Sequence, residues 1–127
     1  MANILVVEDD VLVSDMLSQV LTRAQHRVKV ATDGEDAVNV LQSFTPDVMV
    51  TDILMPKKSG TTLISEVKNQ HPGMSIIAIS GGGRADPIGY LDLSEELGAE
   101  ISFAKPVDND AILMTIDLMM AKKRKKI

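Results

Sequence analysis

Short apolar runs alternate along the chain with longer segments whose apolar residues recur every three or four positions. A continuous apolar run of four to eight residues is typical of a buried strand. Five such runs, each bounded by polar residues, glycine or proline, predict strands. These are Asn3–Val7, Arg27–Ala31, Pro46–Thr51, Ser75–Ile79 and Ile101–Ala104.

Each predicted strand is followed by a segment with helical periodicity. Apolar residues at i, i+3, i+4, i+7 and i+8 form one stripe of an amphipathic helix. The five stripes are Val13, Met16, Leu17, Val20 and Leu21; Ala37, Val38, Leu41 and Phe44; Leu63, Ile64 and Val67 after Gly60; Ile88, Leu91 and Leu97 before Gly98; and Ile112, Leu113, Ile116, Met119 and Met120 after a capping Asp108 or Asn109.

A strand followed by a helix, repeated five times, predicts an α/β fold of the (βα)5 type. Apolar strands that alternate with helices form a parallel sheet covered on both faces, with right-handed crossovers. The length of 127 residues fits one domain with a single sheet. We therefore expect a doubly wound five-stranded parallel sheet.

The composition excludes several classes of protein. The chain contains no cysteine, which excludes disulfides and thiolate metal sites. It shows neither a signal peptide nor an apolar run long enough for a membrane span, so we expect a cytoplasmic location.

Charge is distributed unevenly. The net charge is −5, but five of the 13 basic residues lie in the tail 122–127. The rest of the chain has 8 basic and 18 acidic residues, a net −10, which argues against direct binding to nucleic acid. The tail is interpreted as a solvated helix end, with contact to an anionic partner or membrane surface as the alternative.

Five polar residues stand where predicted strands end: Glu8 and Asp9 after the first, Asp52 after the third, Ser80 after the fourth and Lys105 after the fifth. Parallel strands bring their carboxyl ends to one edge of the sheet, where open α/β sheets bind ligands. Three carboxylates at one place repel one another unless a cation lies between them. Mg²⁺ fits such a site, because it binds a few carboxylates and keeps waters or phosphate oxygens.

A lysine and a hydroxyl beside a metal-binding carboxylate cluster can stabilise a phosphoryl group in transfer. No serine–histidine pair or cysteine is available as a nucleophile, so a carboxylate would form an acyl phosphate. As an alternative, Glu8, Asp9 and Asp52 would serve only as helix-capping and solvated carboxylates.

The chain resembles the receiver domain of bacterial two-component response regulators over essentially its whole length. Four motifs in the expected order carry this resemblance. They are Glu8-Asp9 after Ile4-Leu5-Val6-Val7; Asp52-Ile53-Leu54-Met55-Pro56-Lys57-Lys58-Ser59-Gly60, which matches D-x-x-M-P-x-x-x-G; Ile77-Ala78-Ile79-Ser80-Gly81; and Gly98-Ala99 with Lys105-Pro106.

The resemblance implies a strand order of 2-1-3-4-5, a receiver domain at 1–121 and a separate basic tail at 122–127. It implies that Asp52 accepts a phosphoryl group from a sensor histidine kinase or a histidine phosphotransfer protein. Such a protein promotes only its own phosphorylation and dephosphorylation and is not otherwise an enzyme. A downstream protein would bind the face formed by helix four, strand five and helix five.

The resemblance also implies a role for each site residue. Mg²⁺ would be bound by Asp9, Asp52 and the Leu54 backbone carbonyl, with Glu8 binding directly or through water. The phosphoryl group would contact Lys105, the Ser80 hydroxyl and the Gly81 N–H. A cis peptide bond is implied for Lys105-Pro106.

Two positions depart from the family pattern. Ser102 stands where the family usually carries a Tyr or Phe that couples to the Ser/Thr, and Phe103 is expected on the core side instead. Leu54 stands where aspartyl phosphatases carry a second aspartate, which argues against that class and predicts a long-lived phosphoryl group. A phosphorelay intermediate and a degenerate scaffold remain alternatives. His26 and His71 are expected at the surface.

Overall fold

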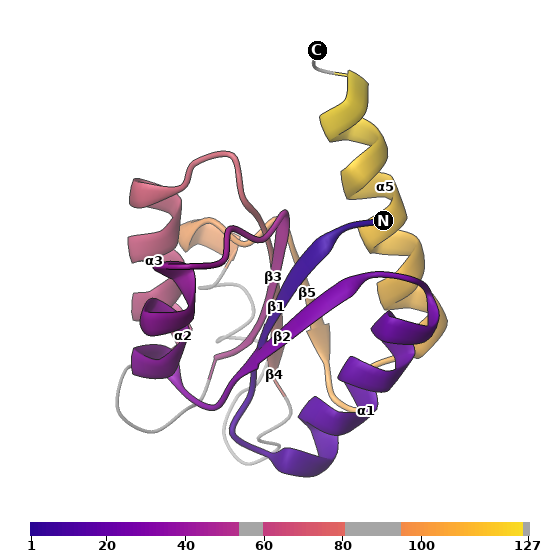
Figure 1. The fold of residues 1–127 in the computed structure, drawn as a ribbon. Helices are drawn as coiled ribbons and strands as arrows, with labels where there is room; N and C mark the ends of the chain where they lie inside the picture. Colours follow the sequence, from indigo (N-terminus) through magenta and orange to yellow (C-terminus); the bar gives the residue numbers. More distant parts are fainter. Residues whose placement is uncertain (54–59, 81–94, 126–127) are drawn as a thin grey trace.

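The computed structural model describes residues 1–53, 60–80 and 95–125. They form one parallel sheet in the order β2-β1-β3-β4-β5, between two layers of helices (Figure 1). The α/β class and the strand order are as predicted. The strands are β1 (Asn3–Val7), β2 (Arg27–Ala31), β3 (Val48–Asp52), β4 (Ser75–Ser80) and β5 (Ile101–Ala104).

Helices cover both faces of the sheet. Helices α2 and α3 lie on one face and α1 and α5 on the other (Figure 1). Their bounds are α1 (Val11–Arg23), α2 (Gly34–Leu41), α3 (Gly60–Gln70) and α5 (Asn109–Lys125). Residues 95–97 are helical and belong to the predicted fourth helix, whose other residues lie outside the described part.

Aspartate side chains cap the first turns of α1 and α5, and the cap of α5 by Asp108 is one of the two that the sequence predicts. The Asp10 carboxylate accepts from the Leu12 N–H at 3.0 Å and caps α1. The Asp108 carboxylate accepts from the N–H groups of Asp110 and Ala111 at 2.9 and 3.1 Å and begins α5. Each cap satisfies a helical N–H that has no partner within the helix.

The sheet divides the core into two clusters. One lies under α1 and α5 and includes Val107, which follows β5. The other lies under α2 and α3 and includes Ile53, which follows β3. Strands β3 and β4 are buried over their whole length, which explains why both read as uninterrupted apolar runs.

The final turns of α5 extend beyond the sheet (Figure 1). The amine of Lys123 donates a hydrogen bond to the carbonyl of Gly73, in the turn between α3 and β4. The basic tail therefore continues α5 as a helix up to Lys125.

The expectation that His26 lies at the surface is wrong. Its side chain is 8% exposed, and its Nδ1 accepts a hydrogen bond from the Ala2 N–H at 3.0 Å. The cause is local: Gln25 has a φ of 70°, which reverses the chain after α1. Since a non-glycine residue gives little warning of a left-handed turn, the sequence did not reveal the reversal.

Burial lowers the pKa of His26 below 6.5, and the positive N-terminus lowers it further, while Asp117 opposes this shift. The folded protein therefore resists a proton that the unfolded chain accepts. Stability contributed by the neutral imidazole is present above pH 6.5 and is lost as the pH falls below it.

We predict that His26→Asn reduces the loss of unfolding free energy between about pH 7.5 and about pH 5.5, by an amount that cannot exceed roughly 1.4 kcal/mol because the pH falls only one unit below the ordinary histidine pKa. Urea unfolding at the two pH values measures this difference. His71→Asn, at a partly exposed histidine, is the control. An identical pH dependence in the wild type and His26→Asn would contradict the prediction.

Candidate functional site

The site is centred on Asp52, the last residue of β3. Strand β3 lies between β1 and β4, so Asp52 ends a strand in the middle of the sheet. Asp52 is only 5% exposed to solvent. A carboxylate with so little access to water requires compensation from nearby cations or donors.

A close approach of two backbones holds this strand end. Gly60, the first residue of α3, packs directly against Asp52 and Ile53. A Cβ atom at Gly60 would lie 2.2 Å from the carbonyl oxygen of Asp52, which no side chain allows. The Gly60 N–H also donates to the Ile53 carbonyl at 2.9 Å. The glycine of the D-x-x-M-P-x-x-x-G motif is thus required by contact rather than by its φ angle.

Two further carboxylates come from the loop after β1. Glu8 is 1% exposed, and its backbone N–H donates to the carbonyl of Ala31 at 3.0 Å. The N–H of Asp10 donates to Oε2 of Glu8, also at 3.0 Å. Asp9 is exposed, yet one oxygen from each of Glu8, Asp9 and Asp52 lies within 4.8 Å of the others.

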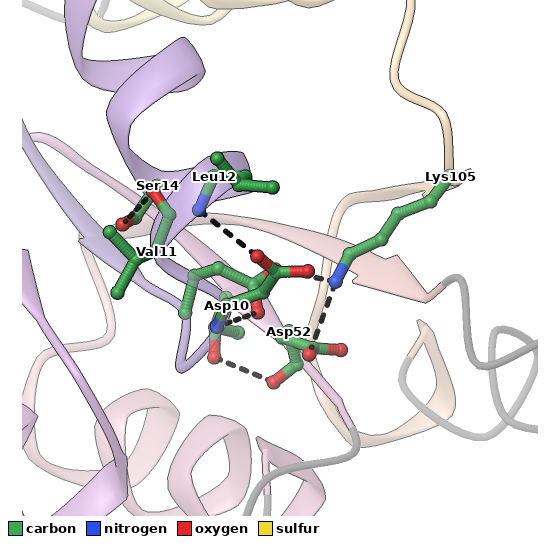
Figure 2. A network of polar contacts seen from close by, with 8 residues as sticks. Asp10, Val11, Leu12, Ser14, Asp52 and Lys105 are labelled. Atoms are coloured by element: carbon green, nitrogen blue, oxygen red, sulfur yellow. Dashed lines mark hydrogen bonds and ion pairs between the residues drawn. The ribbon is translucent and has the colours of Figure 1, made fainter.

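Lys105 reaches this cluster from the loop after β5 (Figure 2). Its Nζ lies 2.6 Å from Oε1 of Glu8 and 3.3 Å from Oδ2 of Asp52. Its backbone N–H donates to the Ser80 carbonyl at 2.9 Å, and the Lys105–Pro106 peptide bond is cis, as predicted. Lys105 is therefore closer to Glu8 than to Asp52, a preference that the sequence did not indicate.

These contacts shift two pKa values. Burial raises the pKa of Glu8 to about 7, and the negative charge of Asp52 adds to the rise, although Lys105 and the Asp10 N–H oppose it. Burial alone would lower the pKa of Lys105, but its contacts with Glu8 and Asp52 raise that pKa above 10.5. The lysine thus stays protonated while Glu8 exchanges its proton near neutral pH.

Ser80 ends β4 beside the site. It is 1% exposed, and its hydroxyl has no hydrogen-bond partner among the described residues. A buried hydroxyl without a partner costs free energy and is available to a ligand. Gly81 and Leu54, the other predicted contributors, lie outside the described residues.

The donor set fits a hard divalent cation. All three side chains offer carboxylate oxygens, the ligand type that Mg²⁺ and Ca²⁺ prefer. The exposure of Asp9 leaves one side of the cluster open to water or to another ligand. Among the described residues, these three form the group whose atoms are close enough to hold an ion.

The two faces of β5 carry different side chains. Phe103 packs against the cluster under α1 and α5, which agrees with its expected core-facing position. Ser102 precedes Phe103 in the strand and therefore points to the opposite face of the sheet. Its hydroxyl donates to Oε2 of Glu95 at 2.5 Å. Ser102, at the position of the usual aromatic residue, is thus hydrogen-bonded to the helical segment 95–97. The sequence did not predict this contact.

Comparison with known proteins identifies a family and relatives that share this sequence pattern. The sequence model of the family described as "Response regulator receiver domain" matches residues 4–117. The chain is 30% identical over 118 residues to the uncharacterized transcriptional regulatory protein YbdJ of Bacillus subtilis, which covers 92% of this chain and 50% of that protein.

Solved structures of similar fold include receiver domains as well. A response regulator receiver domain protein from Clostridium thermocellum superposes with a TM-score of 0.89 at 25% identity, covering 100% of both chains. NtrX from Brucella abortus superposes with a TM-score of 0.89 at 27% identity, covering 98% of this chain and 28% of NtrX. This chain thus spans half of YbdJ and less than a third of NtrX. No helix in the described part of the chain is both long and apolar enough to cross a membrane.

The raised pKa of Glu8 predicts a pH effect on the metal-free protein. The folded state keeps a proton that the unfolded chain releases near pH 4.5, so stability falls as the pH rises from 4.5 to about 7. We expect Glu8→Gln to remove this fall, and saturating Mg²⁺ to offset it in the wild type only. Chemical unfolding with chelator or Mg²⁺ across this range measures both effects. A wild type and variant with parallel pH profiles in chelator would refute the expectation.

Proposed function

Since this chain belongs to the response regulator receiver domain family, we propose that it is a phosphorylation switch whose acceptor is Asp52. One observation carries the proposal: Asp52 ends a central strand, buried, within reach of Lys105 and of two further carboxylates. A sensor histidine kinase or a histidine phosphotransfer protein would supply the phosphoryl group.

The proposed reaction transfers a phosphoryl group from a phosphohistidine to a carboxylate. An Asp52 oxygen attacks phosphorus, the P–N bond breaks, and the imidazole leaves with the bonding electrons and takes up a proton. The product is an acyl phosphate. Hydrolysis returns Asp52 and inorganic phosphate when water attacks the same phosphorus.

Three groups of this chain would stabilise the transferred phosphoryl group. Lys105 already lies 3.3 Å from Asp52 and provides a fixed positive charge for phosphoryl oxygens. The Ser80 hydroxyl, which lacks a partner among the described residues, would donate a hydrogen bond. We assign the Gly81 N–H to the same group by family resemblance, since it lies outside the described residues.

Glu8, Asp9 and Asp52 would hold Mg²⁺, with the Leu54 carbonyl as a further ligand outside the described residues. When bound, the ion would offset carboxylate charge and the charge on the phosphoryl oxygens. The carboxylate cluster supports this assignment, because three acidic side chains converge there and, among the described residues, Lys105 is the cation that contacts them.

Phosphorylation would shift the protein between two conformations that bind a partner differently. Phosphorylated Asp52 competes with Glu8 for Lys105, so the ion pair seen here belongs to the unphosphorylated state. We propose that a downstream protein binds helix four, β5 and α5. The hydrogen bond between Ser102 and Glu95 joins two of these elements.

We propose a cytoplasmic receiver at 1–121 with 122–127 as a basic extension of α5. Turnover of an external substrate is not part of the proposal, because the position two residues after Asp52 is Leu54 and not an acid. Onward transfer to a second histidine would make the chain a relay, and partner binding that ignores Asp52 would make it a scaffold.

We predict that incubation with a small phosphodonor and Mg²⁺ adds one phosphoryl group to the wild type, and that Asp52→Asn accepts none, because an amide is not a nucleophile for phosphorus. Intact-mass analysis measures both. Asp10→Asn, beside the site but directed to the α1 cap, is the control and should be labelled. An adduct on Asp52→Asn would sink the assignment.

The leucine two residues after Asp52 predicts a slow loss of the phosphoryl group. Leucine offers no polar atom to orient an attacking water. We expect Leu54→Asn to shorten the lifetime of the acyl phosphate several-fold, followed by mass analysis after the donor is removed. Equal lifetimes in the wild type and the variant, both short, would contradict this expectation.

A further inference from the structure

Thr51, the residue before the proposed acceptor, carries a hydroxyl inside an otherwise apolar part of β3. Val48, Met49 and Val50 precede it, and Thr51 is 0% exposed. Valine has nearly the same shape and no polar group to remove from water. A buried threonine therefore needs a hydrogen bond that offsets the cost of burying its hydroxyl.

The partner of this hydroxyl is the backbone of the acceptor itself. The Thr51 hydroxyl donates to the carbonyl oxygen of Asp52 at 3.0 Å. Side chains two residues apart in a strand point to the same face of the sheet. Met49 packs in the cluster under α2 and α3, so Thr51 points to that face as well. The hydroxyl thus holds the Asp52 carbonyl from the side of the sheet that α2 and α3 cover.

Two further contacts hold the same peptide group. A Cβ atom at Gly60 would lie 2.2 Å from this carbonyl oxygen and 2.5 Å from Cα of Ile53, so the first residue of α3 is a wall against the peptide. The Ile53 N–H donates to the Ile79 carbonyl of β4 at 3.1 Å. Because a peptide group is planar, contacts that fix its oxygen and its N–H also fix the backbone angle ψ of Asp52.

We propose that Thr51 is a positioning residue, whose hydroxyl sets the direction in which the Asp52 side chain leaves the strand. The Asp52 carboxylate serves several groups at once. One of its oxygens lies 3.3 Å from Nζ of Lys105. One also lies within 4.8 Å of oxygens of Glu8 and Asp9. A change in ψ tilts the Cα–Cβ bond relative to the sheet and displaces the carboxylate from all three groups. For its effect on phosphorylation, this inference rests on the proposed function.

A small error in the direction of the carboxylate affects both of its proposed tasks. Phosphoryl transfer requires the attacking oxygen to lie in line with phosphorus and the leaving group. A displaced carboxylate also binds Mg²⁺ less tightly, because this ion demands near-ideal octahedral geometry. The Thr51 hydroxyl acts through the backbone of Asp52 and is given no role in contacting either ligand.

Two substitutions separate the hydroxyl of Thr51 from the volume of its side chain. Thr51→Val keeps the shape and removes the donor, whereas Thr51→Ser keeps the donor and removes a buried methyl group. We expect Thr51→Val to slow phosphorylation by a small phosphodonor, and to weaken Mg²⁺ binding, by roughly threefold or more. Thr51→Ser should stay close to the wild type in both. Time courses of intact mass and calorimetric titration with Mg²⁺ measure the two effects.

Amide hydrogen exchange gives a measure that does not depend on activity. The N–H groups of Ile53 and Gly60 are both bonded within the backbone that Thr51 holds. In Thr51→Val they should exchange roughly threefold faster or more, because the peptide opens more often. The Arg27 N–H, at the start of β2, should be unchanged. Ser75→Ala, at a buried serine that begins β4 at the opposite end of the sheet, is the matched control and should leave exchange at Ile53 and Gly60 unchanged.

A Thr51→Val protein that matches the wild type in amide exchange, Mg²⁺ affinity and phosphorylation overturns the proposal. So does a loss in Thr51→Val and Thr51→Ser alike that follows their melting temperatures, because that pattern shows a purely structural role. A wild type that accepts no phosphoryl group would refute the proposed function instead. In that case amide exchange in the two variants still decides the role of Thr51.

Discussion

Negative charge concentrated at the carboxyl edge of the sheet is the constraint on which the rest of the site depends. Parallel topology brings three carboxylates together, and burial of Glu8 and Asp52 strengthens the repulsion between those two. Lys105 offsets part of this charge by contacting Glu8 and Asp52 together. Burial raises the pKa of Glu8, and the remaining negative charge of Asp52 adds to the rise. A site in this condition favours a cation, and it responds to any further charge placed on Asp52.

The backbone around Asp52 is held by close contacts, so it has little freedom to move when the charge on Asp52 changes. Gly60 packs against the strand end, and the Ile53 N–H is bonded to Ile79 of the neighbouring strand at 3.1 Å. Movement is therefore expected in side chains around the site. Lys105 has such freedom, because its long side chain crosses from its loop to two different carboxylates.

Much of this architecture could be predicted because it rests on local pattern. Buried parallel strands read as apolar runs, and topology alone brought Glu8, Asp52 and Lys105 to one edge. Distances were beyond that reasoning: nothing in the order of residues shows that Lys105 prefers Glu8. The burial of His26 depends on a left-handed Gln25, and the bond from Ser102 depends on where segment 95–97 packs. Both are products of tertiary packing.

The short stretch after β5 links the acidic site to α5. Lys105 is two residues from Val107, which is buried in the same cluster as Ile112 and Ile116 of α5. Val107 thus connects the lysine of the acidic site to the core-facing side of α5. Any molecule that binds α5 with different affinity when Lys105 moves must, by thermodynamic reciprocity, bias the position of Lys105 by the same free energy. Information can then pass in either direction, from the acidic edge to the helix or from the helix back to it.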